Sequence, residues 1–221
     1  LARRIEKTGI RVFNSARAIE LCDDKTLTAD TLSGKVKMPE TLIAPKTFEG
    51  VKITDEFLIK AEKTFGFPMV VKEAFGSFGK QVYLVKTHEE LRNIVDKIGF
   101  KSFLIQKYIK SSCGRDVRVY VVGDKVVCRM LRVNKNDFRS NVSGGGEAFP
   151  FEENAEIDNA ALLACRALGT DFAGVDVMFG ENSPVVCEVN SNPHFRSALT
   201  ATGVNLADYI MNYVINNLLQ K

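Results

Sequence analysis

The sequence predicts an α+β protein. Runs with strand-like composition come in neighbouring pairs joined by short polar turns, as at residues 116–122 with 125–133 and 172–179 with 185–190. Helical stretches are inserted between one strand pair and the next. A doubly wound α/β fold would require regular alternation of single strands and helices, and that alternation is absent.

Length and composition narrow the class of protein. The 221 residues fit one large domain or two small ones that share an interface. With 45% hydrophobic and 26% charged residues, the chain is neither disordered, collagen-like nor a coiled coil. It has no apolar run of the roughly 18–20 residues that a membrane helix needs, and no signal peptide at its start. The net charge of +3 is too small to indicate nucleic-acid binding. We therefore expect neither a membrane nor a nucleic-acid partner.

The cysteines indicate a reducing compartment. There are five, none of them in a CxxC pair, and only two histidines accompany them, so a structural zinc site is not expected. An odd number of thiols fits a reduced, cytoplasmic protein in which cysteine serves as a small core residue. The chain begins at Leu1, which we interpret as the start of a piece of a longer protein.

The first part of the chain predicts helices around an extended link. Apolar residues at helical spacing predict a helix over 14–33, and prolines bracket an extended link over 37–45. Thr54 is expected to cap a helix that runs to residue 63 and ends before Gly66, with acidic residues in its first turn.

Next comes a glycine loop between two β-rich stretches, 67–74 and 81–86. The segment Thr87–Glu90 has the pattern of a capping box and predicts a helix to about residue 98. Strands are then expected over 103–109, 116–122 and 125–133, the last two joined as a hairpin at Gly123-Asp124.

The C-terminal part predicts a loop, two helices and a second hairpin. The polar, glycine-rich stretch 134–154 is expected to be a mobile loop. Asp158 is expected to cap a helix that ends at Gly169. A hairpin of strands 172–179 and 185–190 follows, then a loop and a final helix over 205–219.

This second hairpin carries the strongest indication of chemistry. A turn centred near Asn182 places Asp176 opposite Glu188, and Asn190 lies on the same face as Glu188. Two carboxylates on opposed residues, whose Cβ atoms are about 5 Å apart, repel each other unless a cation lies between them. Carboxylate and amide oxygens are ligands that magnesium accepts, so the pattern predicts a magnesium site. The alternative is an exposed strand face with incidental acids, which the apolar neighbours disfavour.

The glycine loop is a candidate phosphate site. Lys72 ends a valine-rich strand, and Gly76, Ser77 and Gly79 form the turn, whose backbone N–H groups could close over phosphates. It is not a P-loop, because GxxxxGK[ST] is missing and no helix follows. An ordinary glycine hairpin beside a lysine remains an alternative.

Two further groups of polar residues are weaker candidates. The end of the strand before residue 110 exposes backbone groups that suit a purine edge, although a surface turn fits equally well. Its residues are Gln106, Lys107, Tyr108 and Ile109, with Asp116 and Arg118 on one face of the next strand. Basic residues and an asparagine in or before the glycine-rich loop could bind phosphate or carboxylate, or form a solvated basic loop. They are Arg132, Lys135, Arg139 and Asn141. His194 is a candidate general base, but a lone loop histidine more often has no catalytic role.

The order of these motifs resembles the ATP-grasp enzymes and, more closely, the RimK-type carboxylate–amine ligases, from about residue 14 to 219. The motifs are GRDVR at 114–118, FRSN at 138–141, AGVD at 173–176 and EVN at 188–190. The resemblance implies an ATP-grasp fold in which two α+β subdomains clasp the nucleotide. A smaller, lid-like subdomain would span about 46–109, with 14–45 and 110–221 as the flanking helix and the metal-binding subdomain. The family's preceding small α/β domain is expected to be missing.

The resemblance also assigns roles to residues. It places Lys25 and Lys72 on the nucleotide phosphates, Lys107 and Tyr108 at the adenine hinge, and Asp116 against the nucleotide. It assigns Arg139, Ser140 and Asn141 to phosphates and substrate, with Lys72 and Arg139 as the catalytic pair. It makes Asp176, Glu188 and Asn190 the magnesium ligands, with Glu188 bridging two ions and Mn²⁺ as an alternative metal.

The implied activity is ATP-dependent formation of an amide or peptide bond through an acylphosphate, with release of ADP and phosphate. Glutamate or a related amino acid would be added to a peptide or small-molecule carboxylate, and a homo-oligomer is left open. A kinase that stops at phosphoryl transfer and a non-catalytic nucleotide-binding module are the competing hypotheses. The segment after EVN, Ser191 to Arg196, departs from the family's small-Ser-Pro-Gly pattern. Tentative substrate contacts are Arg132, Asn192 and His194, and the added histidine and arginine would favour a more anionic acceptor.

Overall fold

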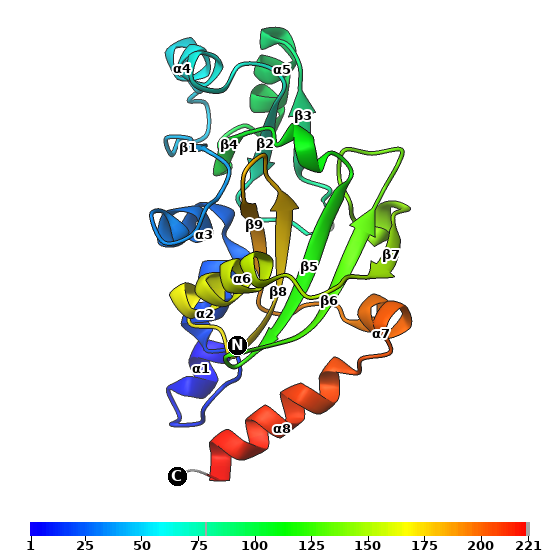
Figure 1. The fold of residues 1–221 in the computed structure, drawn as a ribbon. Coiled ribbons are helices and arrows are strands. Elements are labelled where there is room, and N and C mark those ends of the chain that lie inside the picture. The colour runs from blue at the N-terminus through cyan, green and yellow to red at the C-terminus, as the bar shows by residue number, and fades with distance from the viewer. Residues whose placement is uncertain (78, 220–221) are drawn as a thin grey trace.

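The computed structural model describes residues 1–77 and 79–219, and its strands form two antiparallel sheets (Figure 1). The four-stranded sheet has the order β1-β4-β2-β3 and the five-stranded sheet the order β7-β6-β5-β8-β9. All strand pairs are antiparallel, so the expected α+β class is confirmed.

The elements have the following bounds. The strands are β1 (Thr41–Ile43), β2 (Met69–Glu73), β3 (Val82–Val85), β4 (Phe103–Lys107), β5 (Arg115–Val122), β6 (Lys125–Val133), β7 (Glu147–Pro150), β8 (Phe172–Phe179) and β9 (Pro184–Asn190). The helices are α1 (Ala2–Glu6), α2 (Ala16–Asp23), α3 (Lys25–Leu32), α4 (Asp55–Phe65), α5 (His88–Ile98), α6 (Ala155–Leu168), α7 (Arg196–Thr202) and α8 (Leu206–Leu219), with 3-10 turns η1 (Lys110–Ser112) and η2 (Val142–Gly144).

The four-stranded sheet packs its apolar side chains against α4 and α5, which lie at one end of the molecule (Figure 1). Leu58 of α4 and Leu91 of α5 are fully buried against Met69 and Ile105 of the sheet. The expected cap of α5 is confirmed, since the Thr87 hydroxyl accepts a hydrogen bond from the Glu90 backbone N–H. β1 lies in this sheet, before the expected subdomain boundary at residue 46.

One face of the five-stranded sheet is apolar, and the other carries charged residues beside a second apolar cluster that packs against α7 and α8. Alternate residues of β5, such as Val117 and Val119, are buried on the apolar face, where β5 contacts α6 and β9 contacts α2 and α3. Asp116, Arg118 and Tyr120 lie between them in the sequence and therefore face the opposite side. The alternation explains how one strand contributes both to the core and to a polar site.

The hairpin of β8 and β9, at one edge of the five-stranded sheet, has the predicted register at the carboxylates. Asp176 lies opposite Glu188, and Gly174 lies opposite Asn190. A β-bulge between Asp176 and Val177 shifts the pairing by one residue toward the turn and leaves Cys187 as the extra residue of β9.

Two helix boundaries differ from the prediction because of side-chain caps. The stretch 14–33 is not one helix but two, since the Asp24 carboxylate accepts hydrogen bonds from the N–H groups of Thr26 and Leu27 and starts α3 there. The cap of α6 is Asn154 rather than Asp158, because Asn154 Oδ1 accepts from the Ile157 N–H. Asp158 lies inside α6 and pairs with Arg129 of β6.

Other segments also contain more regular structure than expected. The stretch 134–154 holds η2 and β7, and the loop after β9 leads into the helix α7.

Cys22, Cys128 and Cys165 are buried as expected, whereas Cys113 is exposed and Cys187 half-buried. No helix in the described part of the chain is long and apolar enough to cross a membrane.

Candidate functional site

A cleft of about 560 Å³ lies between the two sheets. Of the residues that the sequence offered as candidates, Lys135 is not among those that line the cleft. The candidates that do line it are Lys25, Lys72, Gly76, Ser77, Gly79, Gln106, Lys107, Tyr108, Ile109, Asp116, Arg118, Arg132, Arg139, Ser140, Asn141, Asp176, Glu188, Asn190, Asn192 and His194. Residues from the glycine loop, the strand end at 106–109 and the β8–β9 hairpin thus converge on a single space.

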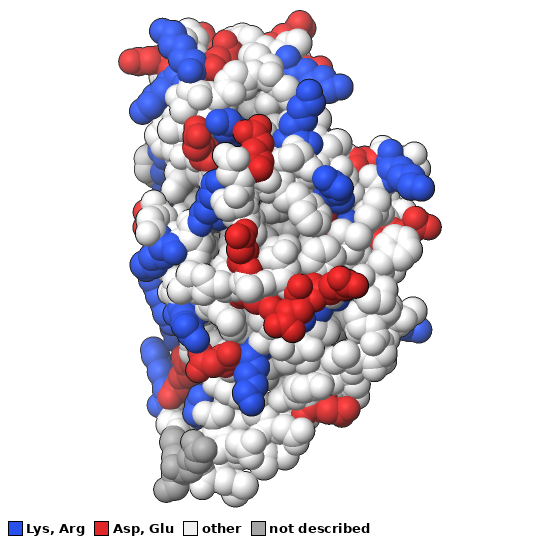
Figure 2. All heavy atoms as spheres, in the orientation of Figure 1, with Lys and Arg blue, Asp and Glu red and all other residues white. Residues whose placement is uncertain are grey.

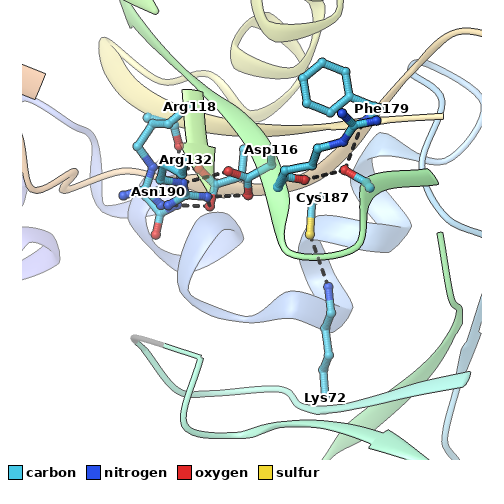
Figure 3. Close-up of polar contacts among 11 residues, drawn as sticks. Lys72, Asp116, Arg118, Arg132, Phe179, Cys187 and Asn190 are labelled. Carbon is cyan, nitrogen blue, oxygen red and sulfur yellow. Dashed lines mark hydrogen bonds and ion pairs between the residues drawn. The ribbon is translucent and has the colours of Figure 1, made fainter. Parts of the chain in front are cut away.

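Buried ion pairs form the floor of the cleft, on the face of the large sheet that carries Asp116 and Asp176 (Figure 3). Arg118 donates two hydrogen bonds to Asp176, at 2.6 and 2.7 Å. The Arg132 guanidinium lies between Asp116 and Asp176, with Nε 2.7 Å from Asp116 Oδ1 and Nη2 2.8 Å from Asp176 Oδ2. Burial alone would raise the pKa of Asp176, but the two arginines outweigh it and lower the pKa to about 2. Asp176 is therefore a carboxylate at neutral pH.

Lys72 approaches the same floor from the opposite sheet. Its side chain extends from β2 toward β9, where Nζ lies 3.4 Å from Cys187 Sγ (Figure 3). Lys72 is only 8% exposed, and no carboxylate among the described residues lies within 4.0 Å of its ammonium. A buried cation without a counter-charge is costly, so this position suits an anionic ligand.

Two side chains from outside the small sheet hold the glycine loop in place. Lys25 Nζ donates to the carbonyl of Gly76 at 2.8 Å, and Arg139 Nη1 donates to the carbonyl of Gly79 at 2.6 Å. Gly76 has a φ of +147°, and a Cβ there would lie 2.3 Å from Gln81 Oε1. A side chain would be strained at this φ, so the loop needs glycine at this position.

Arg139 and the strand end at 106–109 form the other end of the cleft. Arg139 pairs with Asp137 at 2.7 Å, and the ring of the neighbouring Phe138 meets the edge of Tyr108 with centroids 6.5 Å apart. Burial and the neighbouring Cys113 raise the pKa of Tyr108 to about 12, so its hydroxyl keeps its proton. Lys107 pairs with Glu40 at 3.2 Å.

Sequence reasoning missed several residues that line the cleft, namely Asp23, Gln81, Ser112, Arg115 and Cys187. Cys187 faces the cleft because of the bulge in β9, and strict alternation from Glu188 would have placed it on the apolar face. Gln81 Oε1 is buried without a hydrogen-bond partner in the described structure. Arg196, in contrast, begins α7 and is not among the residues that line the cleft, so it gives no support to an anionic acceptor site.

The residues present fit a magnesium–nucleotide ligand. The cleft carries a buried lysine without a counter-charge for phosphate, and the oxygens of Asp176, Glu188 and Asn190 from adjacent strands for the metal. Within the described ranges, no group of three or more histidine, cysteine or acidic residues could hold a metal alone. Magnesium in nucleotide sites takes only one or two carboxylates and completes its shell with phosphate and water, so the sparse set is compatible with it.

Comparison with known families decides between the hypotheses. The family defined by the RimK-like ATP-grasp domain matches residues 22–214. The chain belongs to the RimK-like ATP-grasp family. Its two antiparallel sheets and the cleft between them are accordingly the ATP-grasp fold, and members of the superfamily use ATP and Mg²⁺.

Named relatives indicate the reaction class. A probable alpha-L-glutamate ligase of Methanococcoides burtonii is 35% identical over 216 residues, which are 96% of this chain and 69% of the relative. The glutamate–LysW ligase ArgX of Sulfolobus acidocaldarius is 29% identical over 98% of this chain and 77% of the relative. The RimK-like chain is thus an ATP-dependent carboxylate–amine ligase, and the kinase and non-catalytic hypotheses are not favoured.

Solved structures agree on the fold. The D-alanine–D-alanine ligase of Bacillus anthracis superposes with a TM-score of 0.76 at 21% identity, over 97% of this chain and 75% of that one. The ATP-grasp ligase PsnB, solved with a phosphomimetic variant of its minimal precursor, Mg and ADP, gives a TM-score of 0.71 at 21% identity, over 96% and 65%.

Proposed function

We propose that this RimK-like ligase adds glutamate or a related amino acid to a peptide or small-molecule carboxylate through an acylphosphate. The names of the two curated relatives support glutamate as the amino acid. The departure at Ser191 to Arg196 leaves a broader class of acidic and polar amino acids within the proposal.

In the proposed nucleotide site, the segment about 46–109 forms a lid-like subdomain over the residues at 14–45 and 110–221. Gln106, Lys107, Tyr108 and Ile109 form the adenine hinge, with Asp116 and Arg118 nearby. Lys25, Lys72, Arg139, Ser140 and Asn141 hold the phosphates together with the loop residues Gly76, Ser77 and Gly79. Arg132, Asn192 and His194 complete the substrate side. The observation that carries this arrangement is the buried Lys72 ammonium, which lies 3.4 Å from Cys187 Sγ and has no carboxylate of the described residues within 4.0 Å.

Asp176, Glu188 and Asn190 are the proposed ligands for Mg²⁺, with Glu188 shared between two ions and Mn²⁺ able to substitute. The bound metal would offset the negative charge that develops on the phosphate oxygens. Arg118 and Arg132 keep Asp176 ionised and fix its orientation, so the ligand is preformed before the metal arrives.

The reaction would then proceed in two steps. A carboxylate oxygen of the acceptor attacks the γ-phosphorus of ATP, the bond to the β-phosphate oxygen breaks, and ADP leaves. The amine nitrogen attacks the acyl carbon, loses a proton, and displaces phosphate to give the amide. Lys72 and Arg139 stabilise the negative charge on the phosphoryl group, and the glycine loop excludes water that would hydrolyse the acylphosphate.

Substitution Glu188→Gln tests this proposal. It keeps the size of the side chain but removes the charge, and we expect loss of ATP-dependent ADP release, measured with Mg²⁺ and a panel of amino acids and carboxylates. Glu181→Gln in the exposed turn of the same hairpin is the matched control and should retain activity. Full activity in Glu188→Gln would rule out the metal assignment, and an unfolding midpoint close to that of the wild type would show that the fold is intact.

A further inference from the structure

The segment Ser191–His194, here called the 191–194 loop, follows directly after the proposed metal ligand Asn190. All four of its residues line the cleft. Ser191 and Pro193 are buried, whereas Asn192 and His194 are exposed. Two side chains of the loop therefore support it from beneath, and the other two are accessible from the cleft.

Asn14, far away in the sequence, anchors the start of the loop. Its side chain is 2% exposed and forms hydrogen bonds with the backbone of two segments. Nδ2 donates to the carbonyls of Ser191 and Phe172, at 2.7 and 2.8 Å, while Oδ1 accepts from the N–H groups of Asp171 and Phe172. The amide thus ties the loop to the beginning of β8, using all of its donors and both lone pairs of its oxygen.

A row of residues across the large sheet supports the rest of the loop. Tyr120, Gly174 and Asn190 are cross-strand neighbours on β5, β8 and β9. Pro193 packs onto Gly174, where a Cβ would come within 2.8 Å of the proline ring. Beside it, the fully buried Tyr120 donates from its hydroxyl to the carbonyl of His194 at 2.8 Å.

The proposed function puts Asn192 and His194 on the substrate side of the cleft. We infer that Asn14 and Tyr120 are positioning residues that hold the 191–194 loop in place there. Asn192, which can donate and accept, and the His194 imidazole then recognise the polar groups of the amino-acid substrate. This inference rests on the proposed function, because it assumes that the cleft beyond the metal ligands takes the amino acid.

The anchors have a physical consequence for binding. A loop held at Ser191, Pro193 and His194 does not need to be ordered when the substrate arrives, so binding energy is not lost to loop entropy. Removal of one anchor should weaken amino-acid binding more than nucleotide binding, since the nucleotide contacts lie on other elements. Burial raises the pKa of Tyr120, which keeps the donating proton on its hydroxyl at neutral pH.

Tyr120→Phe tests the inference, because it deletes one hydroxyl and keeps the ring that fills the core. The matched control is Tyr83→Phe, which also loses one hydroxyl hydrogen bond, to Glu73 in the small sheet. Hydrogen–deuterium exchange of the chain reports on the loop without any substrate. We expect the amides of residues 192, 194 and 195 to exchange about fivefold faster in Tyr120→Phe, and to be unchanged in Tyr83→Phe.

ADP release is then measured with each amino acid that supports turnover by the wild type. We expect a rise of about five- to tenfold in the KM for that amino acid in Tyr120→Phe, with the KM for ATP within about twofold of the wild type. Asn14→Asp, which removes the donor to Ser191, should shift the same parameter in the same direction.

The outcomes separate the two proposals. Unchanged exchange at 192–195 in Tyr120→Phe overturns the inference, and so does faster exchange without a change in the amino-acid KM. An equal rise in both KM values also overturns it, since that would indicate general loosening of the site. If no amino acid supports ADP release by the wild type, the proposed function fails and the recognition role of the loop fails with it. In that case the exchange data still decide whether Tyr120 anchors the loop.

Discussion

Arg132 has the most constrained charge in the site. Arg132 is 3% exposed, and its guanidinium bridges Asp116 and Asp176, two carboxylates on different strands. Because its guanidinium is hydrogen-bonded to both carboxylates, Arg132 affects a ligand in the cleft also through Asp116 and Asp176. We infer that Arg132, besides its proposed place on the substrate side, holds Asp176 in position for the metal.

This role predicts a large stability cost for Arg132→Met. The substitution would leave two buried carboxylates with less compensation, and breaking a buried pair typically costs about 3–5 kcal/mol. Urea unfolding at pH 7 without metal measures the change in the free energy of unfolding. The control is Arg166→Met, whose exposed pair with Asp124 should contribute less than about 1 kcal/mol. Equal effects of the two substitutions would contradict the structural role of Arg132.

At this scale, the pairing of Asp176 with Glu188, two of the proposed metal ligands, could be predicted from the sequence, whereas the partners of Asp176 could not. Asp176 and Glu188 lie on one hairpin, and its turn fixes which residues are opposite each other. The arginines that control Asp176 come from β5 and β6, whose position beside β8 depends on the packing of the whole sheet. The same holds for Asn14, which reaches β8 from the N-terminal segment.

At the scale of elements, the start of α6 shows how two good capping residues compete. Asn154 and Asp158 both have side chains that favour a helix N-terminus, and each could begin the helix. Arg129 on the neighbouring strand β6 pairs with Asp158, which leaves Asn154 as the cap. Local sequence therefore predicted the helix and its end at Gly169, whereas the starting residue depends on a tertiary ion pair.

A double-mutant cycle distinguishes the two roles. Asn154→Ala should cost about 1 kcal/mol in the free energy of unfolding, through loss of the cap, whether or not Arg129 is present. Asp158→Ala should lose most of its effect in an Arg129→Ala background, because the two side chains form one ion pair. A measurable coupling between Asn154 and Arg129, with none between Asp158 and Arg129, would reverse the assignment.

For the whole molecule, the cleft is bridged by few polar contacts between the small sheet and the rest of the chain. Lys72 meets Cys187, Lys25 meets Gly76, and Arg139 meets Gly79. Charges of both signs are interspersed over the face in Figure 2 rather than gathered into one basic patch. Inside the cleft, by contrast, Lys72 is a buried cation with no carboxylate of the described residues within 4.0 Å.

The order of the elements and the ATP-grasp resemblance could be predicted because GRDVR, FRSN, AGVD and EVN occur in a fixed sequence. The contacts that join the halves could not, since each unites residues far apart in the chain. Cys187 opposite Lys72 is an example, because it depends on a bulge that no turn residue indicates.

A ligand that contacts both sides of the cleft must stabilise the whole molecule. At a nucleotide concentration about 100-fold above the dissociation constant, linkage contributes about 2.7 kcal/mol to the free energy of unfolding. For a chain of this length the unfolding midpoint should rise by about 5–10 °C. We expect this rise with Mg²⁺ and ADP together and not with either alone, since the carboxylates and Lys72 act on the same ligand. The rise should disappear when Asp176→Asn is combined with Glu188→Gln, and persist in Glu181→Gln. A rise with ADP that is independent of Mg²⁺ would place the nucleotide away from Asp176 and Glu188.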